Sequence, residues 1–256
     1  MSARITLVGN GLLRDCVVEQ LAPHHLTLLP DLAGTIPEET SLLLVIHDCW
    51  NPSIHKQAEE VARELGIKWL RAFLSFGEGV IGPLVRPGRE GCSQCADTRK
   101  MMATTDREDL WKIQQDLTKG DNAIEDQWLS QTGILQMAQL IKNEVVGSAQ
   151  LEGAIHLLNM GSLESSLHRI LPDAYCSVCS SLPEDAEAVI TLKPSIKVSG
   201  YRTRSINDLR NVLSNDYLDP RTGLLNRLMI DFETTYADAI VNLPLFNGNE
   251  GSAGRT

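Results

Sequence analysis

The sequence predicts an α/β protein with a mainly parallel sheet and a structural zinc ion. Strand-like and helix-like segments alternate in the first part of the chain, which indicates a parallel sheet. Residues 40–48, "TSLLLVIHD", are apolar almost throughout, as strands covered on both faces tend to be. Two Cys-x-x-Cys motifs, separated by roughly 80 residues, predict the zinc ion.

The composition is that of a folded protein without a basic surface. Of the 256 residues, 43% are hydrophobic and 22% charged, and the net charge is -10. Nucleic acid and anionic lipid both require basic patches, so we expect neither a nucleic-acid nor a membrane partner. No signal peptide is recognisable, and the longest aliphatic run, residues 42–46, is too short to span a bilayer. We therefore expect the protein to be located in the cytoplasm, where thiols stay reduced.

The first segment, residues 3–21, predicts a strand, a glycine turn and a helix. Its apolar "ITLV" leads into Gly9 and Gly11, and apolar residues then recur at helical spacing. Further elements are predicted, in chain order, as a strand at 25–30, a strand at 40–48, a helix at 51–66, and strands at 67–76 and 79–88.

Helical periodicity dominates the next part of the chain. Residues 108–117 and 128–147 predict helices, because their apolar positions repeat at intervals of three and four. Residues 150–172 predict a pair of strands with Met160 and Gly161 at the turn between them.

The composition changes after the second cysteine motif. Residues 186–199 lie in a stretch with prolines and an acidic cluster, which indicates a linker between a domain at 1–185 and a further segment at 200–256. In that last segment the pattern predicts, in chain order, a helix at 205–215, a turn at 219–223 and a strand at 224–233.

The paired cysteines are the most specific chemical signal. Two thiolates at this spacing can bind one ion from a tight loop, and two such loops complete a tetrahedral site. The predicted ligands are Cys92, Cys95, Cys176 and Cys179. A fully thiolate-ligated ion has no open position, so its role would be structural. The alternatives are incidental buried thiols or a redox pair; for Cys16 and Cys49 we expect simple core positions.

A second candidate, the glycine loop at residues 9–14, is a weak nucleotide signal. In "GNGLLR", Arg14 stands where a dinucleotide-binding loop requires its third glycine. Asp31 follows the second strand, roughly where a ribose-binding acid would lie. The simpler interpretation is that Gly9 and Gly11 only make the turn. The histidines are scattered, so we assign no catalytic residue and no cofactor-binding residue.

Five stretches together resemble the cyclodehydratases of thiazole/oxazole-modified microcins, which make azoline rings in ribosomal peptides: "ITLVGNGLL", "GVIGPLVRPGREGCSQC", "LIKNEVVG", "LHRILPDAYCSVC" and "LDPRTGLLNRL". The first four resemble the part of that family with a ThiF-type, ubiquitin-activating-like fold, including its zinc cysteines. The fifth resembles the opening of an α+β YcaO domain, which would be incomplete here.

The resemblance implies a division of labour. In the family, the YcaO domain uses ATP and Mg²⁺ to convert Cys, Ser or Thr residues of a precursor peptide into rings, while the ThiF-like part is a scaffold and docking surface. The YcaO ligands for ATP and Mg²⁺ would follow residue 256, so we expect this chain alone to be inactive. The winged-helix segment that binds leader peptides would precede residue 4, which predicts a separate leader-peptide-binding protein. Further expected partners are the remaining YcaO domain or a second copy of the chain.

Two other classes of protein remain as alternatives. A ThiF-type adenylating enzyme would activate a ubiquitin-like or sulfur-carrier protein, but it needs an intact glycine loop and a nucleotide-binding arginine and aspartate. A nicotinamide-dependent oxidoreductase is opposed by the same missing glycine at Arg14.

Overall fold

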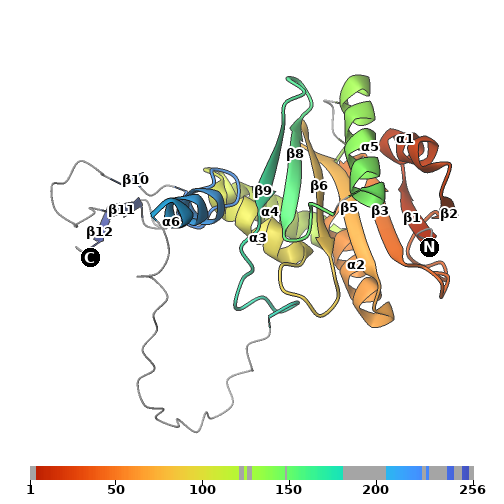
Figure 1. The fold of residues 1–256 in the computed structure, drawn as a ribbon, viewed down its shortest axis with the longest axis horizontal. Helices are drawn as coiled ribbons and strands as arrows, with labels where there is room; N and C mark the ends of the chain where they lie inside the picture. Colours follow the sequence, from red (N-terminus) through yellow and green to blue (C-terminus); the bar gives the residue numbers. More distant parts are fainter. Residues whose placement is uncertain are drawn as a thin grey trace, which may run out of the picture.

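The structure is a computed structural model that describes residues 4–120, 124–125, 129–147, 149–180, 206–226, 229–230, 241–244 and 250–253. Its central sheet has seven strands in the order β2-β1-β3-β5-β6-β8-β9 (Figure 1). These strands are β1 (Arg4–Asn10), β2 (His25–Leu29), β3 (Leu42–His47), β5 (Lys68–Ser75), β6 (Glu78–Val85), β8 (Ala154–Asn159) and β9 (Ser165–Arg169). Two short strands, β4 (Cys49–Trp50) and β7 (Ile124–Glu125), pair separately.

The sheet is parallel in its first part and antiparallel in its second. Strand β1 pairs in parallel with β2 and β3, and β3 pairs in parallel with β5. The pairs β5–β6, β6–β8 and β8–β9 are antiparallel. The sequence correctly predicts the α/β class and the strands of the central sheet. That sheet is mixed, because short turns join β5 to β6 and β8 to β9 and such turns reverse the chain.

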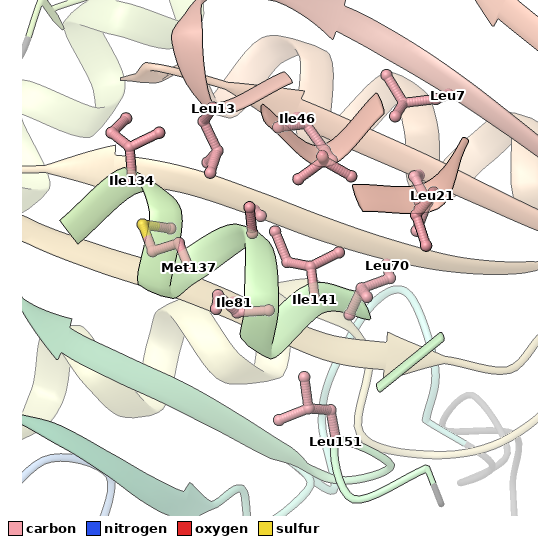
Figure 2. Close-up of a cluster of buried hydrophobic side chains, with 14 of the residues drawn as sticks. Leu7, Leu13, Leu21, Ile46, Leu70, Ile81, Ile134, Met137, Ile141 and Leu151 are labelled. Atoms are coloured by element: carbon pink, nitrogen blue, oxygen red, sulfur yellow. The ribbon is translucent and has the colours of Figure 1, made fainter. Parts of the chain in front are cut away.

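Helices cover both faces of the sheet. On one face, α1 (Leu12–Leu21) and α5 (Gln131–Val146) pack against strand residues such as Leu7, Ile46 and Leu70 (Figure 2). The opposite face packs against α2 (Pro52–Leu65), α3 (Ser93–Ala103) and α4 (Arg107–Gly120). Helix α2 matches its predicted bounds, since the Asn51 side chain caps its start and Gly66, with φ 67°, ends it.

The segment that follows the second cysteine motif is described in parts. Helix α6 (Ile206–Val212) continues into a π-helical turn at Leu213–Tyr217, and the predicted turn at 219–223 is present. Strands β10 (Met229–Ile230), β11 (Val241–Pro244) and β12 (Glu250–Ala253) form a small antiparallel sheet. Of the strand predicted at 224–233, residues 224–226 form a turn instead and only Met229–Ile230 is described as strand. The predicted linker and both of its boundaries lie outside the described residues.

Within the ranges given above, none of the helices combines the length and apolar character that crossing a membrane requires.

Candidate metal centre and its surroundings

The structure brings the four predicted zinc ligands together. Their sulfur atoms all lie within 4.8 Å of one another. The closest pairs are Cys95–Cys179 at 3.5 Å, Cys92–Cys176 at 3.6 Å and Cys92–Cys95 at 4.0 Å. A tetrahedral zinc ion with Zn–S bonds of about 2.3 Å would separate its sulfurs by about 3.8 Å. The cluster therefore fits a tetrahedral ion, and the sulfurs are too far apart for disulfide bonds.

Each cysteine pair is held in a different kind of turn. Cys92 is the N-cap residue of α3 and Cys95 lies in the first turn of that helix, a helix that the sequence analysis did not predict. Cys176 and Cys179 lie in the turns that follow β9. The backbone N–H of Asp173 donates to Cys95 Sγ at 3.4 Å, and that of Val178 donates to Cys176 Sγ at 3.4 Å. Such N–H···S bonds stabilise thiolates, which are the form that binds metal.

The thiols have different proton affinities when no ion is present. Hydrogen bonding from the Cys92 thiol, opposed by burial, lowers the pKa of Cys95 to about 5. The same hydrogen bond, reinforced by burial, raises the pKa of Cys92, while burial is the main cause that raises the pKa of Cys179 to about 11. Without an ion, the Cys95 thiolate is therefore favoured while Cys92 and Cys179 keep their protons, and a bound cation would be needed to deprotonate these two.

Buried polar side chains on α2 and β5 hold the first cysteine loop, which contains Cys92 and Cys95, in place. The Glu59 carboxylate on α2 accepts hydrogen bonds from Ser93 N at 3.2 Å and Ser93 Oγ at 2.6 Å, at the start of α3. Arg71 on β5 donates to the Ser93 carbonyl at 3.3 Å and makes a bidentate ion pair with Asp97. The Arg71 side chain is only 1% exposed.

An irregularity in the pairing of β5 with β6 determines where Arg71 lies. Leu70 pairs with Leu84 but Ala72 pairs with Ile81, so β6 contributes one extra residue opposite Arg71. At this irregularity the Gly82 carbonyl accepts a hydrogen bond from Arg71 Nε at 3.0 Å. Arg71 was not among the predicted site residues; the available signal was one arginine inside the apolar stretch "KWLRAFLS".

A third contact joins the two cysteine loops. Arg99 on α3 donates from Nε to the Leu171 carbonyl at 2.9 Å and from Nη2 to the Pro172 carbonyl at 3.2 Å. These carbonyls directly precede the second cysteine loop. Arg99 therefore holds the two cysteine loops next to each other, in addition to the contacts between the thiols.

The glycine loop serves the turn, as the simpler interpretation predicts. A Cβ on Gly9 would lie 1.8 Å from the Ile46 carbonyl oxygen, and one on Gly11 would lie 2.4 Å from the Asp48 carboxylate. That carboxylate accepts hydrogen bonds from Leu12 N at 2.6 Å and Leu13 N at 2.9 Å. A side chain of the protein thus occupies the helix N-terminus, where a nucleotide-binding loop would hold a phosphate.

Asp31, the candidate ribose-binding acid, serves a local turn. Its side chain accepts a hydrogen bond from the Ala33 amide at 2.9 Å.

Two buried histidines, His47 at the carboxyl end of β3 and His55 in α2, are neutral. Burial lowers the pKa of His47. Burial, and then the positive charge of Arg71, lowers the pKa of His55 well below 6.5. Neutral His55 can accept a hydrogen bond through Nδ1, which lies 3.4 Å from Arg71 Nη1.

A histidine also connects the sheet to the segment at 206–226. His168 on β9 lies between Ser166, with Nε2 2.7 Å from Ser166 Oγ, and Asp219, with Nδ1 2.8 Å from a carboxylate oxygen. Asp219 also accepts hydrogen bonds from the amides of Arg221 and Thr222, and Thr222 Oγ1 donates to the Arg169 carbonyl. The scattered positions gave no hint of this Ser-His-Asp line, which joins the turn at 219–223 to the sheet edge.

A charged group makes a second attachment. Glu78, at the start of β6, accepts from Lys100 Nζ at 2.7 Å and pairs with Arg221. Burial opposes ionisation of Glu78, but attraction to Lys100 and then Arg221 outweighs it, so the pKa lies below the ordinary value of 4.5. We name Glu78, Lys100 and Arg221 the Glu78 clamp.

We expect Glu78→Gln to lower the free energy of unfolding by about 1 to 2 kcal/mol at neutral pH, because two cations lose their carboxylate. A carboxyl group with a lowered pKa stabilises the fold above its unfolded pKa of 4.5. The difference between wild type and variant should therefore shrink as the pH falls below 4.5. Urea unfolding at several pH values measures it. Glu64→Gln, on the exposed end of α2, is the control and should change little at any pH; a pH-independent loss in Glu78→Gln would contradict the assignment.

The fold is similar to those of two heterocyclases and a microcin synthetase of known structure. A heterocyclase in complex with substrate and cofactor matches with a TM-score of 0.57 and 16% identity, over 95% of this chain and 34% of that one. The heterocyclase TruD matches with a TM-score of 0.55 and 17% identity, over 88% and 33% of the two chains. The E. coli microcin synthetase McbBCD complex matches with a TM-score of 0.54 and 14% identity, over 68% and 67%.

These similarities confirm the α/β fold class that the resemblance predicts. The chain has a heterocyclase-like α/β fold and spans about a third of the length of the two heterocyclases. No protein-family model and no curated protein sequence matches it.

Proposed function

We propose that this chain is the scaffold and docking part of an ATP-dependent cyclodehydratase that forms thiazoline and oxazoline rings in a ribosomal precursor peptide. The observation that carries the proposal is the similarity to a heterocyclase over 95% of the chain. In this proposal residues 1–185 form the ThiF-like scaffold, 186–199 the linker and 200–256 the start of a YcaO domain. Cys92, Cys95, Cys176 and Cys179 hold a structural Zn²⁺.

A scaffold role is supported by the state of the glycine loop. The Asp48 carboxylate satisfies the first amides of α1, so a nucleotide phosphate at this point would meet a negative charge. This argues against the ThiF-type adenylating enzyme, which binds ATP at that loop. ATP and Mg²⁺ are therefore assigned to a complete YcaO domain.

Docking is supported by the attachments between the sheet and the segment at 206–226. The His168–Asp219 hydrogen bond and the Glu78 clamp already hold part of the proposed YcaO segment against β9, β6 and α3. The proposed partners are a precursor peptide, a separate leader-peptide-binding protein, and the remaining YcaO domain or a second copy of the chain. The proposed location is the cytoplasm.

The test incubates this chain with Mg-ATP, a precursor peptide rich in Cys, Ser and Thr from the same genome, and a YcaO protein supplied in trans. Mass spectrometry should find loss of one water per ring only when the chain and the YcaO protein are both present. Cys95→Ser should abolish the water loss, whereas Cys16→Ser, outside the cluster, should retain it.

The rival activity has a different signature. An adenylating enzyme would exchange pyrophosphate into ATP without any YcaO protein, and we expect the chain to show no such exchange. Exchange that depends on Gly11, or water loss that is indifferent to the chain, would overturn the proposal.

A further inference from the structure

A cavity of about 650 Å³ lies where the segment at 206–226 meets the sheet body. It is bordered by the β5–β6 turn, by Trp50 of β4, by the end of α3, and by Pro220 and Arg221. Small-molecule and peptide side-chain sites commonly have volumes of about 300 to 1,000 Å³ and form at domain interfaces. Because Pro220 and Arg221 form one wall, the cavity is complete only when that segment is docked.

The apolar end of the cavity is an aromatic pair. The rings of Trp50 and Phe76 meet edge to face, with centroids 6.3 Å apart. Phe76 is 55% exposed and has φ 54°, a left-handed conformation that is unfavourable for a bulky residue. Backbone strain of this kind is typical of binding sites.

The polar end of the cavity contains charges that compensate one another. Glu78 neutralises part of the charge of Lys100 and Arg221, and Asp97 is paired with Arg71 outside the cavity wall. Asp106 also lines the cavity. With no net positive field, the site is poorly suited to a polyphosphate. Arg221 and Lys100 carry more N–H groups than their contacts with Glu78 use, and such donors are suited to peptide carbonyl oxygens.

We propose that this cavity binds an extended peptide segment, with an aromatic or large apolar side chain against Trp50 and Phe76 and backbone carbonyls facing Arg221. The proposal deepens the proposed function and rests on it, since it assigns the precursor peptide a second contact on the scaffold. The segment at 206–226 forms one wall of the cavity that the peptide would fill. Docking of the segment and binding of the peptide should therefore strengthen each other.

The test labels the four tryptophans with 5-fluorotryptophan and follows ¹⁹F NMR signals, with Trp50 assigned through Trp50→Phe. The probes are the capped peptide acetyl-Gly-Gly-Phe-Gly-Gly-amide and its all-glycine counterpart. The Phe peptide should shift the Trp50 signal saturably, and the glycine peptide and Mg-ATP should not. The signal of Trp69, which is fully buried, is the internal reference.

Phe76→Gly separates binding from folding. Glycine adopts φ 54° without strain and Phe76 is exposed, so the free energy of unfolding should not fall, while the affinity for the Phe peptide should fall at least tenfold. Arg221→Ala should also weaken binding, whereas Arg63→Ala, on the exposed side of α2, should not. Full affinity in Phe76→Gly, or no saturable Trp50 shift, would overturn the inference.

The two proposals fail separately. Ring formation with a silent Trp50 signal would reject the cavity and leave the scaffold role standing. Saturable Trp50 shifts without any YcaO-dependent water loss would reject the cyclodehydratase role and leave a peptide-binding cavity.

Discussion

Protein purified without added metal should contain about one zinc ion per chain, bound by Cys92, Cys95, Cys176 and Cys179. The sulfur separations of 3.5 to 4.0 Å between the closest pairs match a tetrahedral thiolate site. Apparent binding free energies of structural zinc sites are about 10 to 16 kcal/mol, which is comparable to the whole stability of a domain, about 5 to 15 kcal/mol. Removal of the ion should therefore unfold much of the α3 side of the sheet.

Cys176→Ser is the sharpest variant for this prediction. A serine hydroxyl is a poor zinc ligand, so elemental analysis should show loss of most of the metal, and urea unfolding should show a loss of several kcal/mol. Cys16→Ser is the matched control because Cys16 lies on α1, outside the cluster, and should keep both metal and stability near wild type. A metal-free, folded wild-type protein with four titratable thiols would contradict the zinc assignment.

Arg71→Met should lower the free energy of unfolding by about 3 to 5 kcal/mol, the usual cost of breaking a buried ion pair. The variant leaves Asp97 without its bidentate partner and removes the donor to the Gly82 and Ser93 carbonyls. Ser93 directly follows Cys92, so the variant should also release zinc at a lower chelator concentration. Urea unfolding and chelator titration are the two measurements.

The controls for Arg71 separate its charge from its packing. Arg63→Met, exposed on α2, should cost less than about 0.5 kcal/mol. Replacement of both partners, Arg71→Met with Asp97→Leu, should cost less than Arg71→Met alone, because no unpaired charge remains. A loss below about 1 kcal/mol in Arg71→Met would mean that Arg71 does not organise the first cysteine loop.

Local sequence patterns determined most of the secondary structure. The continuous apolar run of β3 is typical of a covered strand, and helix α2 has its start and stop residues, Asn51 and Gly66, within the sequence. The cysteine spacing identified the candidate metal ligands, because two residues between cysteines place both thiols on one turn. The π-helical turn at Leu213–Tyr217 and the helix that begins at Ser93 carried no such signal.

Long-range pairing was decided by the tertiary structure alone. Strand β6 pairs with β8, which lies much later in the chain and is not joined to it by a local turn, and a single-strand pattern does not encode such a partner. The same reason explains Arg71, whose partners lie 11 to 26 residues away, and the pairs His168–Asp219 and Glu78–Arg221, which are 51 and 143 residues apart. The sequence by itself determined the fold class, most of the main elements and the four candidate cysteine ligands. Only tertiary packing placed Asp48 on the α1 amides and made the cavity beside Phe76, because both depend on contacts between distant residues.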